Sequence, residues 1–140
     1  MTTRADKIKQ NQQPREFFSD FFDSFARHPI TDALARAVNT NAINQSIRNL
    51  VLTNRGERPF ELDIGCDINK ALFELNDYIT AQNIKLYVRD TLTQYEPRIE
   101  VKDIVVEYGT DENTFKLTIV YYILNTMTLS SVDLLIKRIR

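Results

Sequence analysis

Pro97 separates two parts of the chain whose hydrophobic residues repeat with different periods. Before Pro97, apolar residues recur every three or four positions, which is the period of an amphipathic helix. After it they alternate with polar residues, which is the period of a half-buried strand. Proline has a fixed φ and no backbone N–H, so a helix that reaches Pro97 has to end there. The sequence therefore predicts helices first and strands last, an order typical of an α+β domain.

Three segments before Pro97 carry the helical period. The predicted helices are residues 39–54, capped by Asn39 or Thr40; residues 68–75, capped by Asp67; and a third from Thr80 to about Tyr95. In the first, the apolar stripe consists of Ile43, Ile47, Leu50 and Val51. Each helix thus has one face that needs to be buried.

Three alternating segments follow Pro97, at residues 100–108, 114–124 and 129–139. The first two are separated by "GTDEN", a short stretch of residues that favour turns. Strands joined this closely form an antiparallel meander. We therefore expect an α+β fold in which the N-terminal helices pack on one face of a C-terminal antiparallel β-meander. The chain has 140 residues, which suits one core.

The first 25 residues have a different composition. We expect residues 1–25 to form an arm that is partly disordered or ordered by a partner, and residues 26–140 to form the single α+β domain. The stretch "FFSDFFDSF", residues 17–25, contains five phenylalanines whose adjacent pairs fit a helix better than a strand. This aromatic segment either packs on its own domain or anchors on a neighbour, because aromatic residues concentrate in interface cores.

Composition argues against several classes of function. The formal net charge of −1 gives no basic field for nucleic acid, and the basic residues near the two ends are interpreted as solvated tails. One cysteine, Cys66, and one histidine, His28, leave no ligand set for a cysteine- or histidine-rich metal site. No glycine loop for phosphate is present. Without a signal peptide or an apolar run of about 20 residues, we expect no membrane contact and a cytosol-like compartment.

The loop at residues 53–67 concentrates charge. Its carboxylates allow a glycosidase hypothesis, in which Glu57 or Glu61 works with Asp63 or Asp67 as acid and as nucleophile or base. That mechanism requires a particular distance between the two carboxyl groups, and their spacing in the sequence does not determine this distance. The alternative is that these acids are solvated or paired with the arginines of the same loop.

The same residues carry a resemblance. "LVLTNRGERPFELDIGCDINKALFE", followed by "YEPRI" and a two-strand hairpin, resembles the baseplate wedge protein family of contractile-tailed bacteriophages over roughly residues 43–138. That family includes the matching type VI secretion baseplate component and has been labelled lysozyme-like. The resemblance implies a structural protein without catalytic, cofactor or metal residues. It also implies a place in the virion, in the tail baseplate, after assembly in the host cytoplasm.

The resemblance further implies partners. They are the helical core bundle of the wedge and the tail sheath, whose assembly starts by strand exchange, with the tail tube or hub as further candidates. The near alternative is the type VI component, and the runner-up from another class is the cell-wall glycosidase. The residues expected to bind partners are Glu96, Pro97, Arg98, Arg55, Arg58, Pro59 and Phe60, with Val132, Leu134 and Ile136 on a sheath-facing edge strand.

Opposite charges flank Pro97 in "QYEPRIEV". Because proline stiffens this joint, we expect Glu96 and Arg98 to project from it with little ordering entropy left to lose. Two hypotheses follow for Arg98. It either pairs within the chain, with an acid of the 57–67 loop, or docks into a partner through its planar guanidinium. The family resemblance favours docking, which requires an accessible Arg98 in the free protein.

Overall fold

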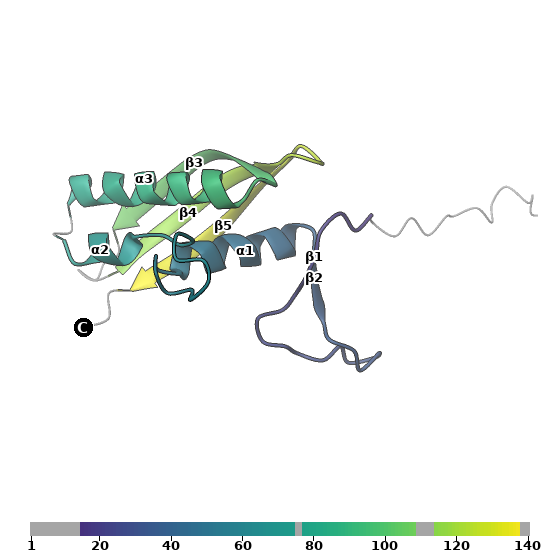
Figure 1. The fold of residues 1–140 in the computed structure, drawn as a ribbon. Coiled ribbons are helices and arrows are strands. Elements are labelled where there is room, and N and C mark those ends of the chain that lie inside the picture. Colours follow the sequence, from purple (N-terminus) through teal and green to yellow (C-terminus); the bar gives the residue numbers. More distant parts are fainter. Residues whose placement is uncertain (1–14, 75–76, 109–113, 138–140) are drawn as a thin grey trace, which may run out of the picture.

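A computed structural model of the chain describes residues 15–74, 77–108 and 114–137. Three helices lie on one side of a three-stranded sheet, and a small hairpin extends from one end (Figure 1). The elements in chain order are β1 (Ser19–Phe21), β2 (Arg36–Val38), α1 (Thr40–Leu52), α2 (Ile68–Leu72), α3 (Tyr78–Tyr95), β3 (Ile99–Tyr108), β4 (Thr114–Ile123) and β5 (Thr128–Lys137). This arrangement confirms the predicted α+β class.

The sheet is an antiparallel meander with the order β3-β4-β5. On β4 the side chains alternate between buried and more exposed positions, as the period of two predicted. The pairing of β4 with β5 is continuous from Thr114↔Lys137 to Ile123↔Thr128. The register of β3 on β4 shifts between Val101 and Asp103. The predicted turn between β3 and β4, at residues 109–113, lies outside the described residues.

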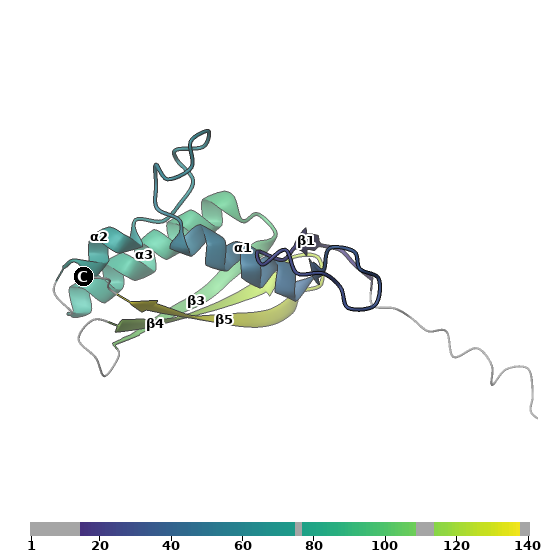
Figure 2. The ribbon, with the colours of Figure 1, turned by 90° about the horizontal axis from the view of Figure 1, so that it is seen from below.

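All three helices cover the same face of the sheet (Figure 2). The core forms between them and the buried face of the strands, and it includes one tyrosine, Tyr121, that is fully buried. The side chains with no exposed surface at its centre are those of Ile43, Ile47, Ile84, Val88, Leu92, Leu117, Ile119 and Tyr121. The apolar stripes read from the sequence therefore define the layers of the domain.

The three helices differ in whether a side chain caps their N-terminus. Helix α3 begins at Tyr78 because the Asp77 side chain accepts a hydrogen bond from the backbone N–H of Thr80 at 2.8 Å. It ends at Tyr95, as Pro97 predicts. Asn39 and Asp67 occupy the expected cap positions of α1 and α2, but neither side chain caps its helix.

The predicted helix at residues 17–25 is wrong. This segment contains the short strand β1, which pairs antiparallel with β2. The cause is tertiary: Asn39 accepts hydrogen bonds through Oδ1 from the backbone N–H groups of Phe17 and Phe18, at 2.9 and 3.3 Å. Its own N–H donates to the Phe18 carbonyl at 2.8 Å. In a helix the Phe22 N–H would donate to the Phe18 carbonyl, but here it donates to the Ala35 carbonyl at 3.4 Å, and the Phe18 carbonyl accepts from Asn39. The proposed boundary at residue 25 stays a prediction.

Candidate docking site

Glu96 and Arg98 form a clasp across Pro97. Arg98 donates through Nε and Nη2 to the two carboxylate oxygens of Glu96, at 2.5 and 2.7 Å. Ser46 of α1 donates its hydroxyl to the same carboxylate at 2.6 Å. Glu96 is only 2% exposed, so the expectation that it projects from the joint is wrong. The helix end turns this side chain inward, toward α1, while Pro97 is exposed.

The clasp keeps a buried carboxylate ionised. Burial opposes ionisation of Glu96, but the hydrogen bonds from Arg98 and Ser46 and the charge of Arg98 outweigh it, so the pKa of Glu96 lies below its usual value. The hydrogen bond with Glu96 raises the pKa of Arg98 in turn. Burial, followed by the nearby charge of Glu96, raises the pKa of Tyr121 to about 12. The Tyr121 hydroxyl donates to Asn44 Oδ1 of α1 at 2.6 Å.

The other face of Arg98 contacts the N-terminal segment. Its guanidinium lies 5.4 Å from the ring centroid of Phe18, which is a cation–π distance. The side chain of Arg98 retains 28% of its exposure. The ion-pair partner of Arg98 is Glu96, so the hypothesis of pairing with an acid of the 57–67 loop is wrong in its choice of acid. The clasp joins α1, the end of α3, the start of β3 and the N-terminal segment.

The loop between α1 and α2, residues 53–67, stands out from the helix layer on the side away from the sheet (Figure 2). Its base is closed by the Cys66 N–H, which donates to the Thr53 carbonyl at 2.8 Å. Gly65 sits at this closure with a φ of +140°, and a Cβ there would lie 2.7 Å from the Thr53 carbonyl oxygen. The close approach of two backbone segments therefore requires glycine.

Tyr95 ties this loop to α3. Its hydroxyl donates to the Asp63 carbonyl at 2.8 Å, and Thr91 donates to the Gly65 carbonyl at 3.2 Å. The thiol of Cys66 is buried beneath the closure, and burial raises its pKa. The loop is thus anchored at its base and along one side, while its tip is free.

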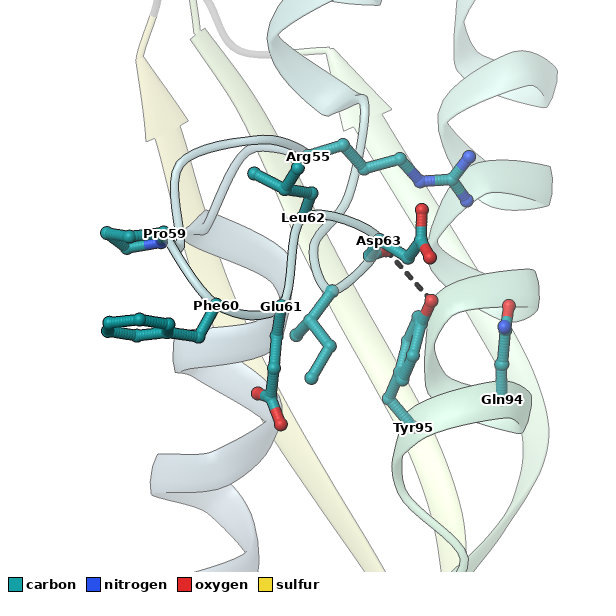
Figure 3. A pocket seen from close by; sticks show the side chains of 9 residues that line it. Arg55, Pro59, Phe60, Glu61, Leu62, Asp63, Gln94 and Tyr95 are labelled. Carbon is teal, nitrogen blue, oxygen red and sulfur yellow. Dashed lines mark hydrogen bonds between the residues drawn. The ribbon is translucent and has the colours of Figure 1, made fainter.

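The tip of the loop carries Pro59 and Phe60, whose rings point away from Tyr95 and α3 (Figure 3). Phe60 is 99% exposed. Below the tip lies a depression of about 750 Å³. It is lined by the loop and the end of α3, including Arg55, Pro59, Phe60, Asp63, Gln94 and Tyr95. Tyr95, which lines this depression, directly precedes Glu96 in the chain. The depression therefore adjoins the Glu96–Arg98 clasp through Tyr95.

The charged residues of the loop mostly contact one another. Arg55 lies 3.7 Å from Asp67, and Arg58 lies 3.9 Å from Glu61. Lys70 of α2 lies 3.1 Å from Asp67, and Glu57 accepts from the Asn54 N–H at 2.9 Å. These acids serve the loop's own conformation. Among the described residues, no group of three or more His, Cys, Asp and Glu side chains could hold a metal ion.

Strand β5 lies at an edge of the described sheet, as the sequence predicted. The side chains of Val132, Leu134 and Ile136 are buried against the helices, with exposures of 4–6%. They are therefore not available to a partner in the free protein. What the edge offers is its backbone, together with the outward side chains, of which Leu135 is 72% exposed.

Three contributors to this region were not predicted as site residues from the sequence. Ser46 was one polar residue of a helix, Phe18 one of five clustered phenylalanines, and Tyr95 the last residue of an apolar stripe. Each becomes visible only when α1, α3 and the N-terminal segment come together. Among the described residues, no helix is both long and apolar enough to span a lipid bilayer.

Comparison with known proteins supplies the context for this geometry. Residues 37–128 match the family described as baseplate wedge protein gp25. The baseplate wedge protein gp25 of Enterobacteria phage T4 is 31% identical over 67 residues, and that match spans 48% of this chain and about half, 51%, of the T4 protein.

Solved structures agree with the fold. A crystal structure of a protein from Geobacter sulfurreducens, proposed to be a tail lysozyme, has a TM-score of 0.65 at 28% identity, covering 70% of this chain and 89% of that one. A chain in the baseplate of the anti-feeding prophage has a TM-score of 0.62 at 19% identity, covering 88% and 87%. A chain in the postcontracted pyocin R2 baseplate gives 0.51 at 12% identity, covering 80% and 96%.

The last two likenesses concern the fold alone. The family match covers well over half of the chain, and it includes the 53–67 loop, the clasp and the β3–β4 hairpin strands. This protein belongs to the baseplate wedge protein gp25 family of contractile tail systems.

Proposed function

We propose that this protein is a structural, non-enzymatic wedge subunit that docks on the helical core of the baseplate wedge through the tip of the 53–67 loop. The observation that carries the proposal is the exposure of Phe60, 99%, on a loop whose base is fixed. An exposed aromatic side chain on an ordered support is a typical interface anchor. The partners are the wedge core and the tail sheath, in the tail baseplate of a virion assembled in the host cytoplasm.

The anchoring of the loop supports this role energetically. A binding loop that is already ordered loses less conformational entropy on association than a mobile one. Here Cys66, Thr91 and Tyr95 hold the loop through hydrogen bonds of 2.8–3.2 Å. Arg58 directly precedes Pro59 in the chain and supplies a cation beside the aromatic tip. The Arg55 side chain extends toward α3 instead, where it lies 3.7 Å from Asp67 (Figure 3). The clasp contributes by fixing the end of α3 on which Tyr95 stands.

The test compares two exposed aromatic residues in binding to the purified helical core of the wedge from the same tail. Phe60→Ser removes the proposed anchor, and Tyr78→Ser, at a position 72% exposed at the start of α3, is the matched control. We expect Phe60→Ser to weaken binding by about 30-fold, corresponding to roughly 2 kcal/mol. The control should bind like the wild type, and both should melt within a few degrees of it. Equal binding of all three proteins would contradict the proposed docking.

We further propose that β5 accepts a strand from a sheath subunit. The pairing of β5 with β4 is continuous, so no bulge interrupts β5, and strands add readily to uninterrupted edges. On the other edge, the bulge between Val101 and Asp103 interrupts β3, and bulges disfavour pairing. Backbone amides of β5 should gain protection from hydrogen exchange when sheath protein is added. Unchanged protection at saturating sheath protein would exclude strand addition.

A glycosidase is the alternative from another class, and one relative at 28% identity is proposed to be a tail lysozyme. The carboxylates of the loop argue for the structural role. Glu57 accepts a backbone hydrogen bond, and Glu61 and Asp67 lie near cations of the same region. Glu61 and Asp63 line the open depression beneath an exposed loop tip. A type VI secretion component remains the near alternative within the same structural class.

A further inference from the structure

The N-terminal hairpin, residues 15–38, carries a free strand edge among exposed aromatic side chains. The hairpin leaves the domain at the N-terminal end of α1 (Figures 1 and 2), and residues 15–36 precede the matched region of 37–128. Its exposed apolar side chains are Phe17, Phe21, Phe22, Phe25, Ile30 and Leu34, with exposures of 36–87%. Unpaired strand edges and apolar surfaces of this kind are places where another chain can bind.

The register of the hairpin decides which backbone groups of β1 are free. The Phe18 carbonyl accepts from the Asn39 N–H at 2.8 Å, so the backbone of Phe18 faces the β2 side. In an antiparallel pair, the residues whose backbone groups face the partner strand occur at every second position. The N–H and C=O of Ser19 and the N–H of Phe21 therefore point away from β2. Among the described residues these three groups have no hydrogen-bond partner.

Side chains close this free edge on both sides of Ser19. Asn39 Oδ1 accepts from the Phe17 N–H at 2.9 Å, and Gln45 donates to the Phe21 carbonyl at 2.6 Å. A long foreign strand that continued past Ser19 would meet an amide and a carbonyl that are already engaged. The edge therefore suits a short contact centred on Ser19, and a two-fold axis at that point would make every flanking contact twice.

A second copy of the chain has the groups that such a contact requires. With Ser19 opposite Ser19 of the second copy, each N–H donates to the other carbonyl, as in the hydrogen-bonded pair of an antiparallel ladder. Phe21 then lies opposite Phe17 of the second copy on both sides of the axis, and aromatic cross-strand pairs stabilise a sheet. The two engaged groups, the Phe21 carbonyl and the Phe17 N–H, also lie opposite each other and keep their present partners.

The same register matches two charges that have no partner within the chain. Among the described residues, Arg15 has no carboxylate within 4 Å and Asp23 has no cation within 4 Å. Each lies four positions from Ser19, on opposite sides of it. An antiparallel contact centred on Ser19 therefore places Arg15 of one copy beside Asp23 of the other, at both ends. Charge complementarity of this kind favours one partner and one register.

We propose that the free protein forms a two-fold dimer through β1, in which two hairpins join edge to edge with Ser19 at the axis. The strand order across the contact becomes β2-β1-β1-β2. Pairing uses up an edge that could otherwise recruit further chains, and a closed two-fold contact does not propagate. The proposal concerns the protein before it meets other baseplate components, and it does not rest on the proposed docking function.

The first experiment locates the axis in the full chain. In Ser19→Cys the two Cα atoms would lie about 5.5 Å apart across the axis. Ser24→Cys is the matched control, because it places a thiol at another exposed serine of the same hairpin, away from the axis. The native cysteine, Cys66, is buried. A short bifunctional thiol crosslinker should join the Ser19→Cys chains in pairs and leave the Ser24→Cys chains single. Linking of neither variant, or of both equally, would overturn the proposal.

Sedimentation equilibrium over a concentration series measures the dimer itself. Ser19→Pro removes an N–H that points away from β2, so it spares the pairing within the hairpin, and Phe17→Ser with Phe21→Ser removes the aromatic pairs. Each change should raise the dissociation constant about tenfold or more. Phe25→Ser, 70% exposed in the same hairpin, is the control and should leave it unchanged. Melting curves establish that each variant is folded. A wild type that stays monomeric at every concentration would contradict the dimer.

Exchanging the charges tests the register without removing any backbone group. Arg15→Asp and Asp23→Lys should each weaken self-association, because each places like charges side by side at both ends of the contact. Mixed in equal amounts, the two variants should form a heterodimer in which both ends again hold opposite charges. A mixture that associates no better than either variant alone would show that Arg15 does not lie beside Asp23.

An extended segment of another baseplate protein is the competing occupant of this edge. Hydrogen exchange distinguishes the two, because self-pairing should protect the Ser19 and Phe21 amides as the concentration of the free protein rises. Protection that appears only when the purified wedge core or sheath protein is added would overturn the proposal and assign the edge to that protein.

Discussion

Arg98 binds both carboxylate oxygens of Glu96, which lies two residues before it in the chain, on the other side of Pro97. The carboxylate is almost fully buried, whereas the guanidinium keeps 28% of its exposure and reaches Phe18. A bidentate arginine–carboxylate pair is strong and directional. The pair therefore fixes the turn from α3 into β3, and through Ser46 it fixes that turn against α1.

Removing Arg98 should destabilise the fold. In Arg98→Ala the Glu96 carboxylate would stay in the interior without its cation, and breaking a buried pair in this way costs on the order of 3 kcal/mol. Docking of Arg98, which the family resemblance favoured, requires an accessible arginine and a cost of about 0.5 kcal/mol or less. Urea unfolding of the wild type and the variant measures the difference. Arg58→Ala, which removes an exposed cation 3.9 Å from Glu61, is the control and should cost about 0.5 kcal/mol or less.

A change of less than about 0.5 kcal/mol in Arg98→Ala would show that the clasp contributes nothing to folding. Arg98 would then be free to serve docking alone, as the family resemblance first suggested. Measuring core binding on the same samples separates the two roles. A variant that melts early but still binds the wedge core places Arg98 in folding and not at the interface.

Stability should fall in acid partly through Glu96. Its pKa is lower in the folded protein than its usual value, so the folded state favours the ionised form. The resulting stabilisation is complete above the unfolded pKa of about 4.3 and is lost as the pH falls through the folded pKa. We expect the unfolding free energy of the wild type to drop more steeply below about pH 4 than that of Glu96→Gln. Parallel curves for the two proteins would refute the assignment.

The two glycines of the loop should differ in their tolerance of alanine. At Gly56, with φ +83°, an added Cβ meets nothing within 4 Å, so Gly56→Ala should cost only the backbone strain of about 1–2 kcal/mol. At Gly65, with φ +140°, the Cβ would lie 2.7 Å from two backbone atoms. Gly65→Ala should cost on the order of 3 kcal/mol and open the base of the loop. Thermal unfolding ranks them, and equal costs would mean that the closure is not tight.

The purified protein should not hydrolyse peptidoglycan. Glu57, Glu61 and Asp67 contact the loop's own backbone or cations. Glu61 and Asp63 line an open depression and not an enclosed cleft that could distort a sugar ring. Labelled cell walls should release no soluble fragments over several hours at pH values from about 4 to 8. Release that is abolished by Glu57→Gln or Asp63→Asn would establish an enzyme and contradict the structural role.

The fold was predictable because its signals are local and periodic. The stripe of α1, the stop at Pro97 and the alternation in β4 each depend on residues within a few positions of one another. These patterns also predict burial, because each helix or strand has to bury its one apolar face against another element. The family motif directed attention to the 53–67 loop. Of its predicted residues, Arg55, Pro59 and Phe60 line the depression, and Arg58 lies 3.9 Å from Glu61, which also lines it.

Tertiary contacts decided what the sequence could not. Phe17 to Phe25 have helical spacing, yet Asn39, Gln45 and the partner strand β2 draw their backbone into a hairpin. Likewise, the charges around Pro97 could point to a partner or into the chain. Ser46, fifty residues from Glu96, provides the interior hydrogen bond that turns the glutamate inward. Periodicity fixes which faces of an element are buried, but the direction of a polar side chain depends on donors that approach only after the layers have packed.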